Sequence, residues 1–231
     1  MRAIILSIGD ELTAGLTVNS NAAWLAQQLL ALGIRSSPHV TVGDDFLAIV
    51  EAVRQAVAGG ADLLLITGGL GPTEDDLTRQ ALADALQETL VEDPDAVLWI
   101  ENWFSARGRV MSPSNRVQAL RPHSASCVEN AIGTAPGLRA RKDATEIYVM
   151  PGVPREMAAM FTRSFLPAIR AAQEKNTGTN GATTLVTRIN TFGLGESVLG
   201  ERIRDLMTRG GNPSVGTTVQ DLDDLANHLG L

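Results

Sequence analysis

The sequence predicts an α/β fold, a three-layer α/β/α domain with a doubly wound, mostly parallel sheet, followed by a small α+β extension. Residues 3–8 are apolar apart from Ser7, and the strand 62–67 contains four consecutive large apolar residues, Leu63 to Ile66. Strands of a parallel sheet read in this way when both faces are buried. Helical periodicity separates the extended segments, and the order β-α-β-α-β implies parallel pairing with right-handed crossovers. A chain of 231 residues has room for one such domain and a small appendage.

The elements at the start of the chain carry clear local signals. After strand 3–8, a helix from about Ser20 to Leu32 meets Gly33, which is placed to end it. An extended segment at 34–42 contains Pro38, which is typical of an edge strand because proline cannot donate a ladder hydrogen bond.

The next helix has both a start and a stop signal. Asp45 stands where it can cap that helix. Its apolar residues recur at helical spacing: Phe46, Ile49, Val50, Val53 and Val57. Gly59-Gly60 ends it, and the buried strand 62–67 follows.

The remaining elements of the domain follow from periodicity and proline positions. Pro94 suits the first position of a helix that carries Val97, Ile100, Trp103 and Phe104, and these side chains indicate a packed core face more than a cation site. Pro151 to Pro154 is a stiff turn that begins a long helix to about Ala172. The other elements are helices at roughly 76–90 and 114–120 and extended segments near 126–128, 137–141 and 145–150.

The predicted domain organisation is a domain at 1–173, a linker at 174–182 and a partial module at 183–231. The linker is polar and turn-forming, without periodicity. The module reads as a strand at 183–192, an amphipathic helix at 196–208 and an extended piece at 214–219. This is a thin core for an independent domain.

Composition limits the classes of function. The net charge of −7 argues against nucleic acid held by a basic surface and against an anionic membrane. The single cysteine, Cys127, excludes an intrachain disulfide and a cysteine metal cluster, and we expect it to be a small half-buried strand residue. No segment approaches the roughly 20 apolar residues of a membrane helix. We therefore expect a cytoplasmic protein.

The most informative segment is 67–78. Its strand runs into three glycines within four residues, Gly68, Gly69 and Gly71, which let the backbone approach a ligand and direct N–H groups at phosphate oxygens. A helix N-terminus follows and favours anions. The acidic residues 74–76 would repel a phosphate unless a divalent metal lay between them, so the segment indicates a phosphate-plus-metal site. It is neither a Walker loop nor a Rossmann fingerprint.

Other polar segments follow strands directly, and topology should bring them to the same edge. Ligands of doubly wound folds bind at the carboxyl ends of the strands. That edge should gather residues 9–11, 42–45, the 67–78 turn and Pro151-Gly152. Several carboxylates would then meet beside a glycine-lined anion pocket, which suits a divalent cation with oxygen ligands.

Plainer interpretations compete at several positions. For Asp45 we favour the helix cap, whereas for Asp76 the glycine turn upstream favours a functional role. Asp10-Glu11 fits turn chemistry as well as it fits a site, and Glu74 and Asp75 suit solvated first-turn charges. Residues 130–137 form a rigid loop that is either a second phosphate or sugar contact or a turn before a hairpin.

Taken together, the motifs resemble a known family. They are Gly9-Asp10-Glu11-Leu12 with Gly15 and residues 19–21, residues 42–45, residues 67–73 with Asp76 and Thr78, residues 112–119, residues 130–137 and residues 151–157. In this order, over about residues 1–172, they resemble the N-terminal domain of the competence/damage-inducible CinA family. That domain is similar to the molybdopterin-binding fold of molybdenum cofactor biosynthesis proteins.

The resemblance implies metal-dependent hydrolysis of ADP-ribose to AMP and ribose 5-phosphate. It makes Asp44 and Asp76 the catalytic or metal-binding carboxylates, with Glu74 as a further ligand of Mg, Mn or Co. The phosphate cradle would be Thr67, Gly68, Gly69, Gly71 and Thr73. The other substrate contacts would be Gly9, Asp10, Glu11, Asn19, Asn115, Gly133, Thr134, Pro151 and Gly152.

The resemblance leaves two alternatives open. One is binding or adenylylation of molybdopterin, and the other is a non-catalytic ligand-binding or assembly domain. Residues 191–218 resemble the start of a small KH-like module, but 220–231 differ from its expected remainder, and the acidic charge gives no support for RNA binding. No part of this sequence resembles the family's amidase domain, so deamidation is not expected here. We expect a homo-oligomer, a dimer or trimer.

Overall fold

The computed structural model describes residues 1–177, 185–208 and 210–218. The chain divides into two units, Met1–Leu185 and Val186–Leu231. The first unit contains the sheet and every predicted site residue. Among the residues described, no helix combines the length and the apolar character that crossing a membrane requires.

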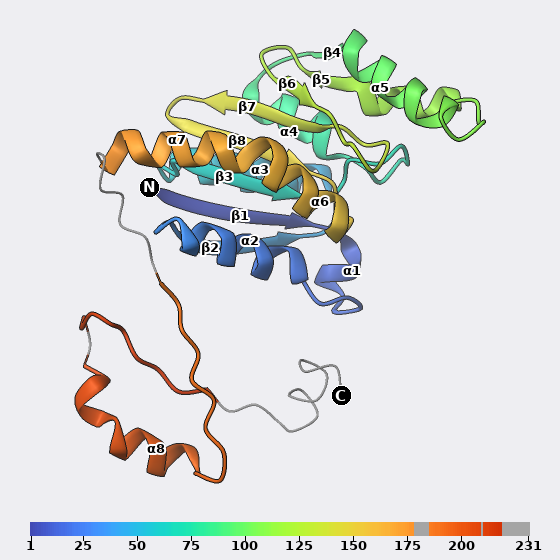
Figure 1. Ribbon diagram of the computed structural model, residues 1–231. Helices are drawn as coiled ribbons and strands as arrows, with labels where there is room; N and C mark the ends of the chain where they lie inside the picture. The colour runs from blue at the N-terminus through green and yellow to red at the C-terminus, as the bar shows by residue number, and fades with distance from the viewer. Residues whose placement is uncertain (178–184, 209, 219–231) are drawn as a thin grey trace. The chain divides into compact units, whose positions relative to one another are not determined.

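A six-stranded sheet in the order β2-β1-β3-β8-β7-β6 forms the centre of the first unit (Figure 1). Its strands are β1 (Arg2–Ile8), β2 (Arg35–Val42), β3 (Leu63–Thr67), β6 (Ser126–Val128), β7 (Gly137–Lys142) and β8 (Thr145–Met150). The first three and β8 are parallel, whereas β7 runs antiparallel to both β8 and β6. The predicted mostly parallel α/β sheet is confirmed, and the strand that contains Pro38 is an edge strand as expected.

Helices cover both faces of the sheet (Figure 1). One face carries α2 (Ser20–Ala31), α6 (Pro154–Met160), the π-helical turn η2 (Phe161–Phe165) and α7 (Leu166–Thr177), and the other carries α3 (Phe46–Ala58) and α4 (Thr78–Leu86). β3 lies between the two cores: Leu64 and Ile66 pack under α3 and α4, while Leu63 and Leu65 pack under α2 and α6. Successive side chains of a strand point to opposite faces, and both faces of β3 are buried, which explains why Leu63 to Ile66 are all apolar.

A smaller subdomain follows α4. It contains α5 (Pro94–Ser105), the 3-10 helix η1 (Pro113–Ala119) and a two-stranded sheet of β4 (Leu90–Glu92) and β5 (Leu120–Pro122). Asp93 caps α5 by accepting a hydrogen bond from the Ala96 amide, and Pro94 opens the helix as predicted. Val97 and Ile100 lie in its core, as the periodicity indicated. The strands β4 and β5 were not expected from the sequence.

Several expected elements differ in the structure. The helix expected at 76–90 spans only Thr78–Leu86, and residues 174–177 of the expected linker complete α7. In the second unit, 196–208 contains the short helices α8 (Glu196–Arg202) and η3 (Arg204–Leu206). Residues 185–192 and 214–218 form no strand, and their apolar side chains lack a covering layer, with Ile189 83% and Phe192 86% exposed.

The boundaries expected for the domain, the linker and the partial module, 1–173, 174–182 and 183–231, stay a prediction. The remaining residues of the expected linker, 178–182, lie outside the described residues. The same is true of 183–184 of the expected strand and 219 of the last extended piece. A strand without a pairing partner is not stable, so alternation of apolar and polar residues is not enough to form one at 185–192.

Candidate functional site

The parallel strands end at a common edge, and main-chain hydrogen bonds join their ends. The Gly9 amide after β1 donates to the Val42 carbonyl of β2 at 3.0 Å. The Gly68 amide after β3 donates to the Met150 carbonyl of β8 at 3.1 Å. The predicted convergence of residues 9–11, 42–45, 67–78 and 151–152 is therefore what the fold produces.

At Gly68 and Gly69 the glycine turn, residues 68–71, passes too close to its neighbours to carry a side chain, whereas Leu70 packs into the core. Gly68 has a φ of 108°, and a Cβ there would overlap the Ile8 carbonyl oxygen. Gly69 has a φ of 63°, and its Cβ would overlap the Thr78 hydroxyl. Both the backbone conformation and the space therefore require glycine. Gly152 lies directly against Gly68, with ordinary room for a methyl group.

A buried polar corner ties the turn to the Pro151-Gly152 segment. The Thr67 hydroxyl donates to the Pro151 carbonyl at 3.0 Å. The Asn21 amide donates to the Thr67 hydroxyl at 3.0 Å and to the Gly152 carbonyl at 2.7 Å. Asn21 was quoted in the motif but not counted as a site residue, and its position on the buried side of α2 was the signal that could have identified it.

Asn19, which the sequence predicts as a substrate contact, has a structural role as a helix cap. It is the N-cap of α2, where its side chain accepts a hydrogen bond from the Ala22 amide at 3.0 Å. Its amide also donates to the Thr41 hydroxyl at 3.4 Å. Asn19 therefore positions the helix that delivers Asn21 to the corner.

Thr78 and Arg79, at the start of α4, hold the turn from below. The Thr78 hydroxyl donates to the Gly68 carbonyl at 2.9 Å. Arg79 is only 1% exposed, and its guanidinium donates to the Leu70 carbonyl at 2.6 Å and the Gly71 carbonyl at 3.3 Å. Burial lowers the pKa of Arg79 to about 10, so it still carries its charge at neutral pH.

Arg79 is a residue that the sequence analysis missed. An arginine in a helix normally reads as a solvated face. The available signal was that it directly follows Thr78 at the end of the glycine motif. The buried guanidinium of Arg79 places a positive charge directly against the glycine turn, where the sequence predicts a phosphate site.

The Asp76 carboxylate is turned onto the glycine turn itself. It accepts hydrogen bonds from the Gly71 amide at 2.6 Å and the Thr73 amide at 2.9 Å, and also from the Thr73 hydroxyl. Asp76 does not cap α4, whose N-cap is Leu77. Its carboxylate therefore fixes the turn, and the Gly71 amide is already used within the protein.

Asp10 and Asp44 form a reciprocal pair between the ends of β1 and β2. The Asp10 amide donates to Asp44 Oδ2 at 2.9 Å, and the Asp44 amide donates to Asp10 Oδ1 at 3.0 Å. Asp10 opens the short helix α1 (Asp10–Thr13). Burial raises the pKa of Asp44 above its usual range, and the charges of Asp10, Glu11 and Asp75 add to this, while the hydrogen bond from the Asp10 amide opposes it. Asp44 is thus a carboxylate in a crowded acidic surrounding.

The three predicted metal ligands are not assembled as a ligand set. Within the described ranges, no three His, Cys, Asp or Glu side chains are grouped so that they could hold a metal ion. Asp76 is engaged with the turn, and Glu74 is exposed. The Asp10–Asp44 pair fits a cation better, because hard oxygen donors and mutual repulsion both favour one, but it needs ligands from a bound diphosphate to complete the set.

Asn115, Gly133 and Thr134 lie outside this arrangement. The Asn115 amide donates to Gln118 Oε1 at 3.2 Å, and Gln118 is the residue that reaches the Leu70 carbonyl, at 3.5 Å. Gly133 and Thr134 belong to the loop between β6 and β7. Residues 130–137 lead into the antiparallel pair of β7 and β8, which agrees with their interpretation as a turn before a hairpin, whereas a role as a ligand contact stays a prediction.

Cys127 and Asp45 have the plainer roles that the sequence favoured. Cys127 lies half-buried in β6, and burial raises the pKa of its thiol to about 12, which rules out a thiolate at neutral pH. Asp45 caps α3 by accepting a hydrogen bond from the Ala48 amide at 2.8 Å.

Comparison with known proteins agrees with this geometry. The family described as a probable molybdopterin binding domain matches residues 4–171. The crystal structure of the protein CinA, of unknown function, from Thermoplasma acidophilum is 34% identical with a TM-score of 0.65, and covers 76% of this chain and 96% of that one. This chain belongs to the CinA family. The resemblance identified from the motifs is confirmed.

Longer CinA-like proteins align over most of the chain. The protein from Desulforapulum autotrophicum is 41% identical over 209 residues, which are 90% of this chain and 49% of that one. The protein from Deinococcus deserti is 44% identical over 216 residues, 93% of this chain and 51% of that one. The chain spans about half the length of these curated relatives.

The fold extends beyond the CinA family. A molybdopterin biosynthesis protein from Mycobacterium abscessus has a TM-score of 0.52 at 20% identity, and the match covers 78% of this chain and 98% of that one. At this identity the likeness concerns the fold alone. The molybdopterin-binding-like fold expected from the motifs is confirmed.

Proposed function

We propose that this CinA-family chain binds ADP-ribose at the glycine turn and hydrolyses its diphosphate to AMP and ribose 5-phosphate with a divalent cation. The observation that carries the proposal is that an anion-binding turn and the paired carboxylates Asp10 and Asp44 lie at one edge of one sheet. A glycine turn alone would bind phosphate without chemistry. The adjacent carboxylates add a base and a place for a cation.

The turn provides the contacts to phosphate. From the sequence we expect the amides of residues 68–71 together to bind the phosphate. The amides of Gly68 and Gly71 already donate hydrogen bonds within the described residues, so the phosphate contacts are assigned to the amides of Gly69 and Leu70. Arg79 holds the carbonyl of Leu70 from inside, which keeps this peptide segment fixed. Preorganised donors of this kind stabilise charge that develops on phosphate oxygens.

Asp44 is the residue we assign as the base. Without a cation, burial and the neighbouring carboxylates raise the pKa of Asp44. A divalent cation bound beside it would lower that pKa and keep the carboxylate ionised, so that it can accept a proton. A divalent cation bound beside Asp10 and Asp44 would neutralise the diphosphate and acidify an attacking water. We assign Asp76 a positioning role through the turn and give Glu74 no part.

The test is to incubate the purified chain with ADP-ribose and Mg²⁺, Mn²⁺ or Co²⁺ and to quantify AMP. The proposal predicts AMP and ribose 5-phosphate in equal amounts, and no product when EDTA is present. Intact ADP-ribose with every metal, at protein concentrations that bind it, would support the non-catalytic ligand-binding alternative instead. Light scattering during the same preparation tests the expected dimer or trimer.

A second function is favoured by the fold and by the family's description as a probable molybdopterin binding domain. In this alternative the turn binds the phosphate of molybdopterin, and ATP supplies an adenylyl group. Adenylylated pterin formed from ATP and molybdopterin, without cleavage of ADP-ribose, would favour it over the first proposal.

A further inference from the structure

A cavity of about 260 Å³ lies between α5 and the loop that joins β6 to β7. Trp99 and Trp103 form its aromatic wall, and the loop residues on the other side include Asn130, Gly133 and Thr134. None of the glycine turn lines it. The cavity is therefore a separate place from the diphosphate site, and it accounts for two predicted contacts that lie away from the turn.

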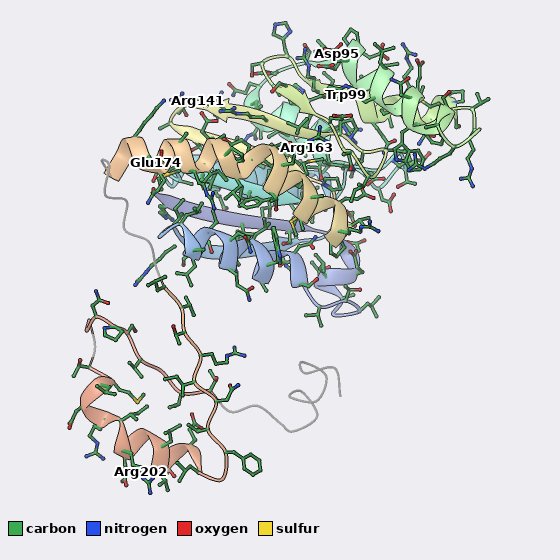
Figure 2. The ribbon with its side chains drawn as sticks, viewed as in Figure 1. Asp95, Trp99, Arg141, Arg163, Glu174 and Arg202 are labelled. Carbon is green, nitrogen blue, oxygen red and sulfur yellow. The ribbon has the colours of Figure 1, made fainter. Side chains whose placement is uncertain are left out.

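The aromatic wall is more than core packing. Trp99 and Trp103 are one helical turn apart on α5, and Figure 2 shows Trp99 on this helix. Trp99 packs against the buried cluster of Ala96, Val97, Ile100 and Ala119, which explains its presence. Trp103 is half-buried, and the Arg107 guanidinium lies 3.8 Å from its ring centroid. The Trp103 indole N–H is buried with no hydrogen-bond partner among the described residues.

The opposite wall is built in advance of any ligand. Asn130 is buried, and its carbonyl oxygen accepts hydrogen bonds from the amides of Ile132 at 3.2 Å and Gly133 at 3.0 Å. Its side-chain amide donates to the Ala135 carbonyl at 3.1 Å and to Glu156 Oε2 at 2.7 Å. A Cβ at Gly133 would overlap the Glu156 carboxylate. The loop is held rigidly against α6.

That same contact connects the cavity to the diphosphate site. Glu156 lies four residues after Gly152, whose backbone packs against Gly68. Four residues span at most about 14 Å. One wall of the cavity and one side of the glycine turn are thus fixed to the same short segment.

We propose that this cavity binds the planar nitrogen heterocycle of the ligand by stacking on the indole rings. The inference rests on the proposed function, since it places the base of a ligand whose diphosphate lies at the turn. The volume is below that of sites for whole drug-sized ligands, which is the scale expected for a single bicyclic ring. Indole faces and a stacked guanidinium bind any such ring. The side-chain amide of Asn102 at the rim of the cavity suits its polar edge, whereas Asn130 is fully hydrogen-bonded within the loop and shapes the wall. The heterocycle is the purine of a nucleotide or the pterin of a molybdopterin-like compound.

The test is calorimetric titration of the whole chain with adenosine, with neopterin and with inorganic pyrophosphate. Trp103→Ala is expected to weaken heterocycle binding roughly 5- to 150-fold, the range for loss of one base–aromatic stack, and to leave pyrophosphate affinity unchanged. Trp24→Phe is the matched control, because Trp24 packs edge-on against Phe161 in the other core and should have no effect. Saturable binding of adenosine or of neopterin identifies the source of the ring.

Two outcomes would overturn the proposal: neither heterocycle binds, or Trp103→Ala binds the heterocycle as tightly as the wild type. If Trp103→Ala also loses pyrophosphate binding, Trp103→Phe decides, because it retains an aromatic face. The proposal requires Trp103→Phe to bind the heterocycle within a few-fold of the wild type, and loss equal to that of alanine contradicts it. Absence of AMP production from ADP-ribose would refute the proposed hydrolysis without altering these binding results.

Discussion

Asp76 and Arg79 hold the same peptide segment from opposite sides. Asp76 accepts hydrogen bonds from the amides of Gly71 and Thr73, while Arg79 donates to the carbonyls of Leu70 and Gly71. Gly71 is therefore fixed at both its N–H and its carbonyl group. A turn held in this way presents its remaining amides without having to reorganise when an anion binds, which is the condition for strong electrostatic stabilisation.

Asp76→Asn should loosen the turn, because the Gly71 and Thr73 amides bond to different oxygens of the carboxylate and the variant replaces one of these oxygens with an NH₂ donor. An amide donor left without an acceptor costs roughly 1–3 kcal/mol when it is shielded from water. We expect a loss of this size in the free energy of unfolding measured in urea, together with weaker pyrophosphate binding. Unchanged stability and affinity would show that the carboxylate does not organise the turn.

Arg79→Met tests the buried positive charge. The Leu70 and Gly71 carbonyls lose their donors, so stability should fall by roughly 1–3 kcal/mol. Affinity for pyrophosphate should fall and should depend less on salt, because a nearby charge is gone. Adenosine affinity is the internal control, and an equal fall for adenosine and pyrophosphate would indicate a structural role only.

Asp44 gives two pH effects. As a base, Asp44 must be deprotonated, so the rate of ADP-ribose hydrolysis should fall in acid, and a divalent cation bound beside it should move that fall to lower pH. For stability, a raised pKa means that the folded chain holds this proton more tightly than the unfolded chain. The contribution of Asp44 is therefore fully present below its ordinary pKa and is lost as the pH rises through the raised value.

The corresponding measurement compares melting temperatures of Asp44→Asn and the wild type at pH 4 and pH 7. The difference should move in favour of the variant at the higher pH. Parallel pH dependence of the two proteins would mean that the acidic surrounding of Asp44 has no energetic effect.

Gly68→Ala and Gly152→Ala form a matched pair at the closest approach in the site. Gly68 has a φ of 108° and no room beside the Ile8 carbonyl, so the alanine variant should lose more than about 2 kcal/mol of stability. At Gly152 the added methyl group makes ordinary contact with Gly68, so stability should change little. Equal melting temperatures for both variants would contradict the packing described for the turn.

The fold could be predicted because its signals are local. Four consecutive apolar residues, Leu63 to Ile66, indicated that strand 62–67 is buried. Asp45, as a capping side chain, and Pro94, as a proline at the first helical position, marked the starts of two helices. The convergence of Asp10 and Asp44 required only the rule that parallel strands share one edge. The turn before a hairpin was named as an alternative for 130–137, because the loop sequence suits a turn, and the antiparallel pair of β7 and β8 follows it.

The details of the site depend on directions that spacing does not contain. From the sequence, Asp76 was predicted to be a metal ligand. In the structure its carboxylate accepts hydrogen bonds from the Gly71 and Thr73 amides of its own loop. Arg79 reads as a surface charge until the fold buries it. Residues 185–192 alternate as a strand does, but a strand needs a partner, and alternation does not say whether one exists.

The most direct measurement is AMP formation from ADP-ribose and a divalent cation by two variants that each remove one acidic charge near the turn. We predict that Glu74→Gln, at an exposed position, retains the wild-type rate of AMP formation and that Asp44→Asn loses it. Activity that survives in Asp44→Asn and is lost in Glu74→Gln would contradict the assignment of the Asp10–Asp44 edge as the reacting centre.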